Sequence, residues 1–358
     1  KAVRNVRELI SPRLKGMDVT DLKAVDEAMR ELDGTDNMGR LGGNATTAVS
    51  YAAAKAGAVL KGVELHEHLG QGSKVLPVPC MNVINGGKHA GGNLRVQEFM
   101  VVPCGAPSFS EALRAGTEVY HALRQVLRKG MGPSAINVGD EGGFAPPFDT
   151  SRQALDALLK AIEAAGYAPG KEVSLAMDAA ASEFYSNGVY EVDGRRMAPG
   201  EIVDFYIDLS KEYPLISLED PVHEEGFLDM AELTRKVGTR LQLVGDDLFV
   251  TNVDRLRRGI EAKAGNAMLL KVNQIGTVSD AMRAAAMCFD HGYNVMVSHR
   301  SGESEDTTIA DIAVALECGQ IKSGAPARAE RTAKYNRLLR IEEGLGGKAV
   351  FKGREAFL

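Results

Sequence analysis

Short apolar runs alternate with amphipathic segments from about residue 75 onward, and this alternation constrains the fold more than any other feature. Eight runs have the length and composition of buried strands: 75–84, 96–102, 173–179, 214–220, 241–247, 267–273, 293–299 and 319–325. Helical patterns lie between the later runs, at 151–166, 227–238, 253–265, 278–292 and 305–319. Alternating strands and helices indicate a parallel sheet, and eight strands favour a closed TIM-type α/β barrel over an open doubly wound sheet.

Only the glycine-rich stretch "NGGKHAGGNLR" joins the first two predicted strands. A parallel pair needs a crossover connection of about a dozen or more residues, usually a helix. We therefore expect the first two strands of the barrel to be antiparallel.

The first 70 or so residues have helical periodicity at 3–16, 19–34 and 44–62, and no convincing strand. Thr20 carries an N-cap signal for the second helix, and Gly34 carries a stop signal. We predict two domains: a partial, helical capping domain over residues 1–70 and a catalytic barrel over residues 71–358. Because Lys1 opens directly into a helical pattern, we expect the sequence to start partway through the first domain.

Charge and cysteine usage narrow the class of function. The formal net charge is −6, so no basic surface argues for nucleic acid or membrane binding. No stretch approaches the roughly 20 apolar residues of a membrane span, and no signal-peptide pattern opens the chain. The four cysteines are scattered without a CxxC pair. They predict buried, reduced thiols in a cytoplasmic protein rather than disulfides or a zinc site.

Six successive predicted strands finish in, or directly before, an ionisable residue: Asp178, Glu219, Asp246, Lys271, His299 and Lys322. The carboxyl ends of barrel strands face one mouth, where the active sites of such barrels lie. A single residue of this kind is ordinarily a solvated loop charge. Six in register, flanked by apolar residues, predict one shared site.

The carboxylates of Asp178, Glu219 and Asp246 form a set of hard oxygen ligands, without cysteine or paired histidine. This set favours Mg²⁺, or Mn²⁺, over zinc. Three carboxylates that close would repel one another without a cation between them. The alternative is three separate ion pairs with arginines at the barrel rim.

Lys271 and Lys322 bring two ammonium groups to the same mouth, and "SHRSGESEDTT" places Arg300 and Ser301 before a helix predicted to begin near Glu305. Arginine and serine beside a helix N-terminus suit a phosphate group. A metal, a phosphate site and a lysine base together suggest proton abstraction next to a carboxylate. We expect neighbouring cations to keep Lys271 neutral, because like charge lowers the pKa of an ammonium.

The base needs an acid on the opposite face of the substrate. Glu141 lies in the loop "INVGDEGGFAPP", where it is either an aimed catalytic carboxyl group or a turn residue. Glu98 could pair with Glu141 so that one of them keeps a proton, or could serve as a supporting partner. His89 sits among glycines that form either a mobile lid or merely a tight connection. The GxGxxG fingerprint is absent, so no dinucleotide site is predicted.

The motifs "VPCMNVINGGKHAGG", "VQEFMVVP", "NVGDEGGFAP", "SLEDP", "GDDLFVTN", "LLKVNQIGT", "SHRSGESEDTTIADIAVA" and "KYNRLLRIEE" resemble the enolase family over essentially the whole chain. This superfamily is a standard example of a lysine or histidine base that works with one or two Mg²⁺ ions. The resemblance implies an enolase-type barrel, preceded by the helical remainder of a small α+β domain. It also implies a cytoplasmic homodimer or higher homo-oligomer that acts on a small phosphorylated substrate.

The reaction that the resemblance implies is the reversible dehydration of 2-phosphoglycerate to phosphoenolpyruvate in glycolysis and gluconeogenesis. Lys271 would be the base at C2, Glu141 the acid at the C3 hydroxyl, and Lys322 a stabilising charge at the carboxylate. The implied ligands of the first Mg²⁺ are Asp178, Glu219 and Asp246. Those of the phosphate are Arg300 and Ser301, and the pocket is completed by His89, Gln97, Glu98 and His299.

The sequence departs from the family pattern at its front. Enolases begin with a small antiparallel sheet and a mobile loop whose serine contributes to a second Mg²⁺, and Lys1 matches only the helical part of that domain. If these residues are absent from the protein, we expect weaker binding of the second metal and weaker turnover. Two other functions stay open: another superfamily activity, such as an acid-sugar dehydratase or a racemase, and a non-catalytic binding or scaffold role.

Overall fold

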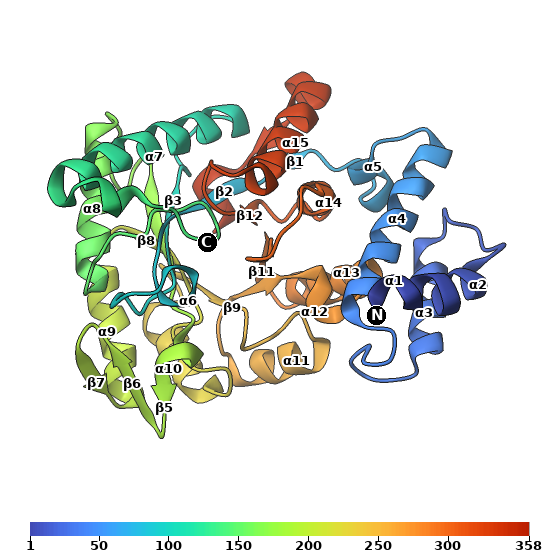
Figure 1. The fold of residues 1–358 in the computed structure, drawn as a ribbon, viewed down its shortest axis with the longest axis horizontal. Coiled ribbons are helices and arrows are strands. Elements are labelled where there is room, and N and C mark those ends of the chain that lie inside the picture. The colour runs from blue at the N-terminus through green and yellow to red at the C-terminus, as the bar shows by residue number, and fades with distance from the viewer. Residues whose placement is uncertain (358) are drawn as a thin grey trace.

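The computed structural model describes residues 1–357, and its centre is a closed eight-stranded barrel (Figure 1). All eight predicted strands form it. In chain order they are β2 (Val78–Asn85), β3 (Glu98–Val102), β4 (Ser174–Asp178), β8 (Leu215–Glu219), β9 (Gln242–Gly245), β10 (Ala267–Leu270), β11 (Asn294–Ser298) and β12 (Gln320–Lys322). Strand β3 is antiparallel to both β2 and β4, and the remaining neighbours are parallel, so the expected antiparallel first pair is confirmed.

Helices cover the outside of the barrel. They are α7 (Phe109–Met131), α8 (Ser151–Ala164), α9 (Pro199–Glu212), α10 (Phe227–Val237), α11 (Val253–Ala262), α13 (Val278–Asp290), α14 (Thr308–Ala315) and α15 (Ala329–Leu345). Two short helices, α6 (Gly87–Ala90) and α12 (Val272–Ile275), lie at the mouth of the barrel. Short 3₁₀ turns span Pro133–Ile136, Ala181–Phe184, Gly346–Lys348 and Gly353–Ala356.

The first 69 residues are helical, as predicted, and α1 to α4 stand to one side of the barrel (Figure 1). The elements are α1 (Ala2–Asn5), a π-helical segment (Val6–Ile10), α2 (Ser11–Leu14), α3 (Leu22–Asp33), α4 (Gly43–Lys61) and α5 (Leu65–Leu69). Gly34 ends α3 with a φ of 68°, a left-handed conformation that glycine adopts without strain. The N-cap prediction was wrong by one residue, because the Asp21 side chain, and not Thr20, accepts the Ala24 amide.

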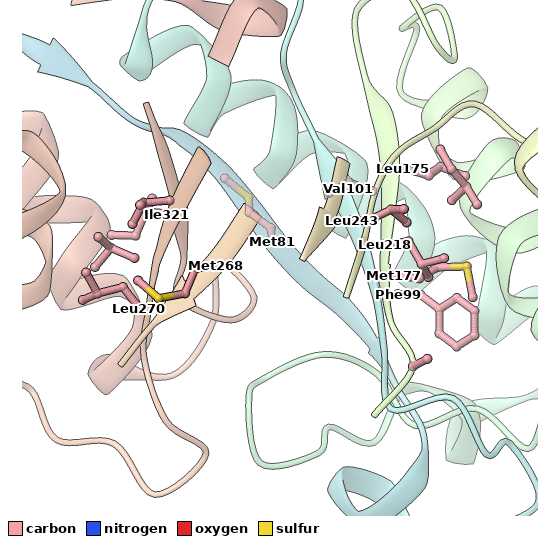
Figure 2. Packing of buried hydrophobic residues seen from close by; sticks show 14 of the residues in the cluster. Met81, Phe99, Val101, Leu175, Met177, Leu218, Leu243, Met268, Leu270 and Ile321 are labelled. Atoms are coloured by element: carbon pink, nitrogen blue, oxygen red, sulfur yellow. The ribbon is translucent and has the colours of Figure 1, made fainter. Parts of the chain in front are cut away.

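A two-residue period divides the strand side chains between two cores. Alternate residues such as Leu175, Met177, Met268 and Leu270 point outward into the helical layer (Figure 2). The residues between them, such as Leu269, fill the barrel interior. Because neighbouring side chains on a strand point to opposite faces, the residue two positions beyond an interior residue also points inward.

Buried hydrogen bonds join the helical segment to the barrel. Ser50 Oγ accepts the amide of Val278 at 2.9 Å, and Asp26 Oδ2 accepts the amide of Ser279 at 2.9 Å. Both amides belong to the first turn of α13, whose N–H groups have no partner within the helix. These contacts fix α3 and α4 against the barrel wall.

Five strands lie outside the barrel: four of them were not predicted, and the fifth, β1 (Val75–Leu76), is the start of the predicted strand 75–84, which divides in two. A three-stranded antiparallel sheet follows β4 and comprises β5 (Tyr185–Ser186), β6 (Val189–Val192) and β7 (Arg195–Met197). The pair β1 (Val75–Leu76) and β13 (Val350–Phe351) joins the start of the barrel segment to the end of the chain. All four cysteines are buried and free, as predicted. Within residues 1–357, no helix combines the length and apolar character that a membrane crossing requires.

Candidate active site

The carboxyl ends of the strands open into a cavity of about 420 Å³. It is lined by all but one of the predicted site residues: His89, Gln97, Glu98, Glu141, Asp178, Asp246, Lys271, His299, Arg300, Ser301 and Lys322. The exception is Glu219, which is buried beneath the lining. The strand period explains much of this convergence, because Asp178 and Lys271 lie two residues beyond the interior residues Ala176 and Leu269.

Lys322 is the buried centre of the carboxylate cluster. Its Nζ lies 2.8 Å from Asp178 Oδ2, 2.9 Å from both Glu219 oxygens and 3.0 Å from Glu98 Oε2. Burial alone would lower the pKa of Lys322, but Asp178 and Glu219 hold it well above its usual value. Conversely, burial and the charge of Asp178 raise the pKa of Glu219 well above its usual value. One ammonium therefore does not balance the carboxylates that surround it.

Lys271 follows β10 directly and pairs with Asp246, which follows β9. The backbone amide of Lys271 donates to Thr251 Oγ1 at 3.0 Å, and the Gln274 side chain donates to Asp246 Oδ1 at 2.7 Å. Burial lowers the pKa of Lys271, but the Asp246 charge outweighs it, and the pKa is raised. In this pairing the lysine is an ammonium, so the expectation of a neutral Lys271 is not met while Asp246 remains its partner.

At this mouth, among the described residues, two groups have ligand atoms that all lie within 4.8 Å of one another: Asp220, Asp246 and Asp247, and His89, Glu98 and Glu141. The predicted metal ligands Asp178, Glu219 and Asp246 stay a prediction, and Lys322 pairs with both Asp178 and Glu219. Burial and the charge of Asp246 raise the pKa of Asp247 to about 6, and they raise that of Asp220 well above its usual value.

The charge of the cavity fits a cation. Eight Asp or Glu residues line it, against four Lys or Arg residues. Burial first, and repulsion between neighbouring carboxylates second, raise the pKa values of Glu219 and Asp220, and a cation at this mouth would offset both effects. Carboxylate oxygens without thiolates are the donors that hard divalent cations prefer. The acidic residues of this mouth could therefore hold a metal ion.

Glu141 faces a second group of polar residues across the cavity. The Asn82 side chain donates to Glu141 Oε2 at 3.0 Å, and His299 Nε2 lies 3.4 Å from the same oxygen. Burial raises the pKa of Glu141, but His299 and His89 bring it well below its usual value. Burial and the charge of Glu141 raise the pKa of Glu98 well above its usual value. These opposite shifts favour the proton on Glu98 over Glu141.

His89 connects the glycine-rich segment to the barrel mouth. Its Nε2 lies 2.8 Å from Ser301 Oγ, and its Nδ1 lies 3.6 Å from Glu98 and 3.8 Å from Glu141. The short helix α6 carries it, and Gly91 follows with a φ of 69°. Whether this segment works as a lid stays a prediction.

The segment after β11 supplies the predicted phosphate ligands. The Glu303 carboxylate accepts the backbone amide of Arg300 at 3.2 Å, which folds the segment back on itself. The following helix, α14, begins at Thr308 and not near Glu305. The Asp306 carboxylate accepts the Thr308 amide at 2.8 Å and pairs with Lys55 of α4. These contacts hold Asp306 just before the first residue of α14.

Sequence reasoning missed several residues of this cavity. Asp220 and Asp247 directly follow the predicted ligands in "LED" and "GDD", so adjacent acidic residues were a usable signal. Gln274 is a neutral partner of Asp246, and Arg331 contacts His299 from α15. No local pattern marks these two, because their partners are distant in the sequence.

A closed barrel with lysines, histidines and excess carboxylates at the carboxyl ends of its strands defines a TIM-barrel enzyme of the acid–base class.

Comparison with known proteins identifies the family. The model of the enolase C-terminal TIM barrel domain matches residues 73–358, and that of the enolase N-terminal domain matches residues 1–69. The enolase of Methanopyrus kandleri is 57% identical over 360 aligned residues, which cover 100% of this chain and 84% of the relative. For the enolase of Methanocaldococcus jannaschii the identity is 58%, with 96% and 81% covered, and for that of Thermococcus kodakarensis it is 54%, with 99% and 83% covered.

The chain therefore belongs to the enolase family. It is a lyase with enolase function, of the phosphopyruvate hydratase type.

Proposed function

We propose that the cavity binds 2-phosphoglycerate and carries out its reversible dehydration to phosphoenolpyruvate. The observation that carries this proposal is the convergence of Lys271, Lys322, Glu141 and the strand-end carboxylates on one cavity of about 420 Å³. The substrate has a carboxylate, a weakly acidic C2 proton, a C3 hydroxyl and a phosphate. Each of these groups meets a side chain of matching chemistry on a different element.

The carboxylates of Asp178, Glu219 and Asp246 hold Mg²⁺ in this proposal. Bound Mg²⁺ supplies the positive charge that stabilises the enediolate form of the substrate carboxylate. The surroundings of Glu219 support this assignment, because burial first, and then the charge of Asp178, raise its pKa, and a bound cation would offset both effects. The adjoining Asp220 and Asp247 keep the mouth acidic.

Lys271 takes the C2 proton on its Nζ, so it must first be neutral. Its ammonium is stabilised by Asp246, whose carboxylate is one of the proposed metal ligands. A cation held by Asp246 would weaken the contact that raises the pKa of Lys271. Burial and the like charge of Lys322 then both favour the neutral amine.

Glu141 gives its proton to the C3 hydroxyl as the C3–O bond breaks, and water leaves. The electron pair of the C2–H bond becomes the C2–C3 double bond, so one proton is taken by Lys271 and one is given by Glu141. In the present arrangement the proton lies on Glu98. Glu98 and Glu141 both flank the Nδ1 atom of His89, so a proton moving between them would make Glu141 the acid.

Arg300 and Ser301 hold the phosphate. The Arg300 side chain has no ion-pair or hydrogen-bond partner among residues 1–357, although it lines the cavity. The hydroxyl of Ser301 rests on His89, and the two can receive a phosphate oxygen together. A second Mg²⁺, bound with the substrate, would add positive charge near the phosphate. His299 and Gln97 complete the pocket, and the enzyme works as a cytoplasmic homo-oligomer.

The proposal is tested by measuring the formation of phosphoenolpyruvate from 2-phosphoglycerate through the ultraviolet absorbance of phosphoenolpyruvate. Activity should require Mg²⁺, disappear with EDTA and return when Mg²⁺ is restored in excess. Analytical ultracentrifugation of the same sample measures the oligomeric state. Absence of both turnover and Mg²⁺-dependent calorimetric binding of 2-phosphoglycerate would refute the proposal.

A further inference from the structure

Arg331 is a fully buried arginine in the first turn of α15. Its Nη1 donates to the carbonyl oxygen of Arg300 at 2.7 Å and also contacts Nδ1 of His299. Its Nη2 donates to the carbonyl oxygens of Ser301 at 2.6 Å and Asp140 at 3.1 Å. One guanidinium therefore joins the segment after β11 to the loop that carries Glu141.

Packing does not explain this residue. A buried charge is costly unless it is paired, and the nearest carboxylate oxygen, Glu330 Oε1, lies 3.8 Å from Arg331 Nε. Nε has no hydrogen-bond partner among the described residues. An apolar side chain of similar volume would fill the space without that cost. The cation is held by neutral acceptors, and each of them belongs to a loop of the active site.

The contact with His299 determines where the imidazole carries its proton. A guanidinium can only donate hydrogen bonds, so Nδ1 of His299 must be the acceptor. The neutral ring then carries its hydrogen on Nε2, which lies 3.4 Å from Glu141 Oε2. Burial lowers the pKa of His299, and the positive charges of Arg331 and Lys322 lower it further. The carboxylate of Glu141 raises it, but the pKa stays below its usual value. These three groups are the charges that face the ring.

The same contact distinguishes the two oxygens of Glu141. Asn82 Nδ2 donates a hydrogen bond to Oε2, and His299 Nε2, which has no hydrogen-bond partner among the described residues, faces the same oxygen from 3.4 Å. Oε1 lies toward His89, at 3.8 Å from its Nδ1. A proton on Glu141 would therefore reside on Oε1.

We propose that Arg331 is a positioning residue that holds His299 in its Nε2–H tautomer and thereby assigns the acid proton of Glu141 to Oε1. Its second pair of contacts sets the backbone of Arg300 and Ser301 relative to the Glu141 loop. The packing of this junction leaves little tolerance, because a Cβ on Gly324 would lie 2.7 Å from the Glu141 carbonyl oxygen and 2.9 Å from Arg331 Cδ. The consequence for the acid step rests on the proposed role of Glu141, whereas the tautomer does not.

The tautomer can be measured directly in the unmodified protein. Long-range ¹H–¹⁵N correlation spectra of histidine-labelled protein distinguish Nδ1–H, Nε2–H and doubly protonated rings, and the signals lost in His299→Gln assign the residue. We expect the Nε2–H form at neutral pH. A ring protonated on Nδ1, or on both nitrogens, would overturn the proposal without any arginine variant.

Two substitutions separate the roles of Arg331. Arg331→Met removes every donor, so we expect a mixed His299 tautomer, a fall in kcat of about 10- to 100-fold and an altered pH profile of kcat. This loss is smaller than the roughly 10²–10⁴-fold effect of removing an acid or base itself. Arg331→Lys keeps one donor for Nδ1 but cannot reach all three carbonyls. It should retain the tautomer and the shape of the pH profile while KM rises.

Arg328→Lys is the matched control. Arg328 is a half-exposed arginine at the start of the same helix, and its side chain donates to the carbonyl oxygen of Gly139 at 3.4 Å. The variant should keep the wild-type tautomer and kinetics. An Arg331→Met enzyme with the wild-type tautomer and pH profile would refute the proposal. Equal losses of activity in Arg331→Lys and Arg328→Lys would also refute it. If Arg331→Met does not fold, the wild-type spectrum and Arg331→Lys still decide. Failure of the Glu141 assignment would appear separately, as dehydration surviving in Glu141→Gln.

Discussion

Replacing Lys322 with methionine removes an ammonium that touches three buried carboxylates. The side chain of Lys322 is 2% exposed, and those of Asp178, Glu219 and Glu98 are 5%, 2% and 2% exposed. Methionine fills a similar volume, so the substitution changes charge far more than packing. The carboxylates must then repel one another, take up protons or bind another cation.

The expected loss of stability follows from this geometry. Removing one partner of a buried ion pair costs about 3–5 kcal/mol. Unfolding entropy of about 2.1 cal/mol/K per residue gives about 0.75 kcal/mol/K for 358 residues. The melting temperature should therefore fall by about 4–7 °C at neutral pH in the absence of divalent cations.

Thermal unfolding with and without Mg²⁺, at about pH 5 and about pH 7.5, measures the effect. The pKa values of Glu98 and Glu219 are already raised, and losing Lys322 raises them further. Protons bound at the lower pH relieve the repulsion, so the deficit should be smaller at about pH 5. The carboxylates freed from Lys322 should bind Mg²⁺ more tightly than those of the wild type, so Mg²⁺ should stabilise the variant more than the wild type and narrow the deficit; binding at a concentration of 100 Kd contributes about 2.7 kcal/mol.

Lys334→Met is the matched control for a buried lysine without a carboxylate cluster. Its ammonium is held by the carbonyl oxygens of Ser304 and Glu330, and its nearest carboxylate, that of Glu303, lies 3.7 Å away. It should lose stability without any restoration by Mg²⁺. If Lys322→Met matched the wild type without Mg²⁺, or its deficit grew on acidification, the electrostatic reasoning would be wrong.

Four further outcomes are expected. Lys271→Ala should abolish exchange of the C2 proton with solvent, measured by NMR in deuterated water, and surviving exchange would remove the base assignment. Glu141→Gln should keep this exchange while dehydration falls by about 10²–10⁴-fold, and equal loss of both would contradict a separate acid. Burial and the neighbouring Asp246 raise the pKa of Asp247 to about 6, so the folded state binds this proton more tightly than the unfolded chain does. The stability that this proton contributes is therefore lost as the pH rises from about 4 to 6. Asp247→Asn should therefore stabilise the metal-free protein at pH 7 and not at pH 4 in urea titrations, and a gain at pH 4 alone would reverse the sign of the argument. Asp21→Ala should cost about 1 kcal/mol through the lost cap of α3, whereas Thr20→Ala should cost less, because Thr20 does not accept the Ala24 amide.

The position of the site could be predicted because it depends on strand periodicity and chain direction. Apolar runs located the strands, and the short glycine-rich connection indicated that β3 reverses direction. Once the strands are in place, an ionisable residue at the carboxyl end of each, such as Asp178 or Lys322, must lie at one mouth. Family resemblance then supplied roles that spacing alone does not. The small sheet β5–β7 was missed, because its strands are too short to show a period.

The pairings within the site could not be predicted in the same way. The lysine placed as a neutral base forms an ion pair with Asp246, and Lys322 separates two of the carboxylates predicted to share a metal. These contacts join residues 25 to 144 positions apart, and the distances among them depend on how the barrel closes. Charge in a buried site is set by the nearest partner, and the identity of that partner is a property of the fold.

The sequence by itself thus determined the barrel, the reversed second strand, the ring of strand-end residues and the family, because each follows from local periodicity or from motifs read along the chain. Only the tertiary structure decided which lysine neutralises which carboxylate, which of Glu98 and Glu141 keeps a proton, and that Arg331 orients His299. The physical reason is that burial and Coulomb energies fall off over a few ångströms in space. No order of residues along the chain specifies those distances until the barrel has closed.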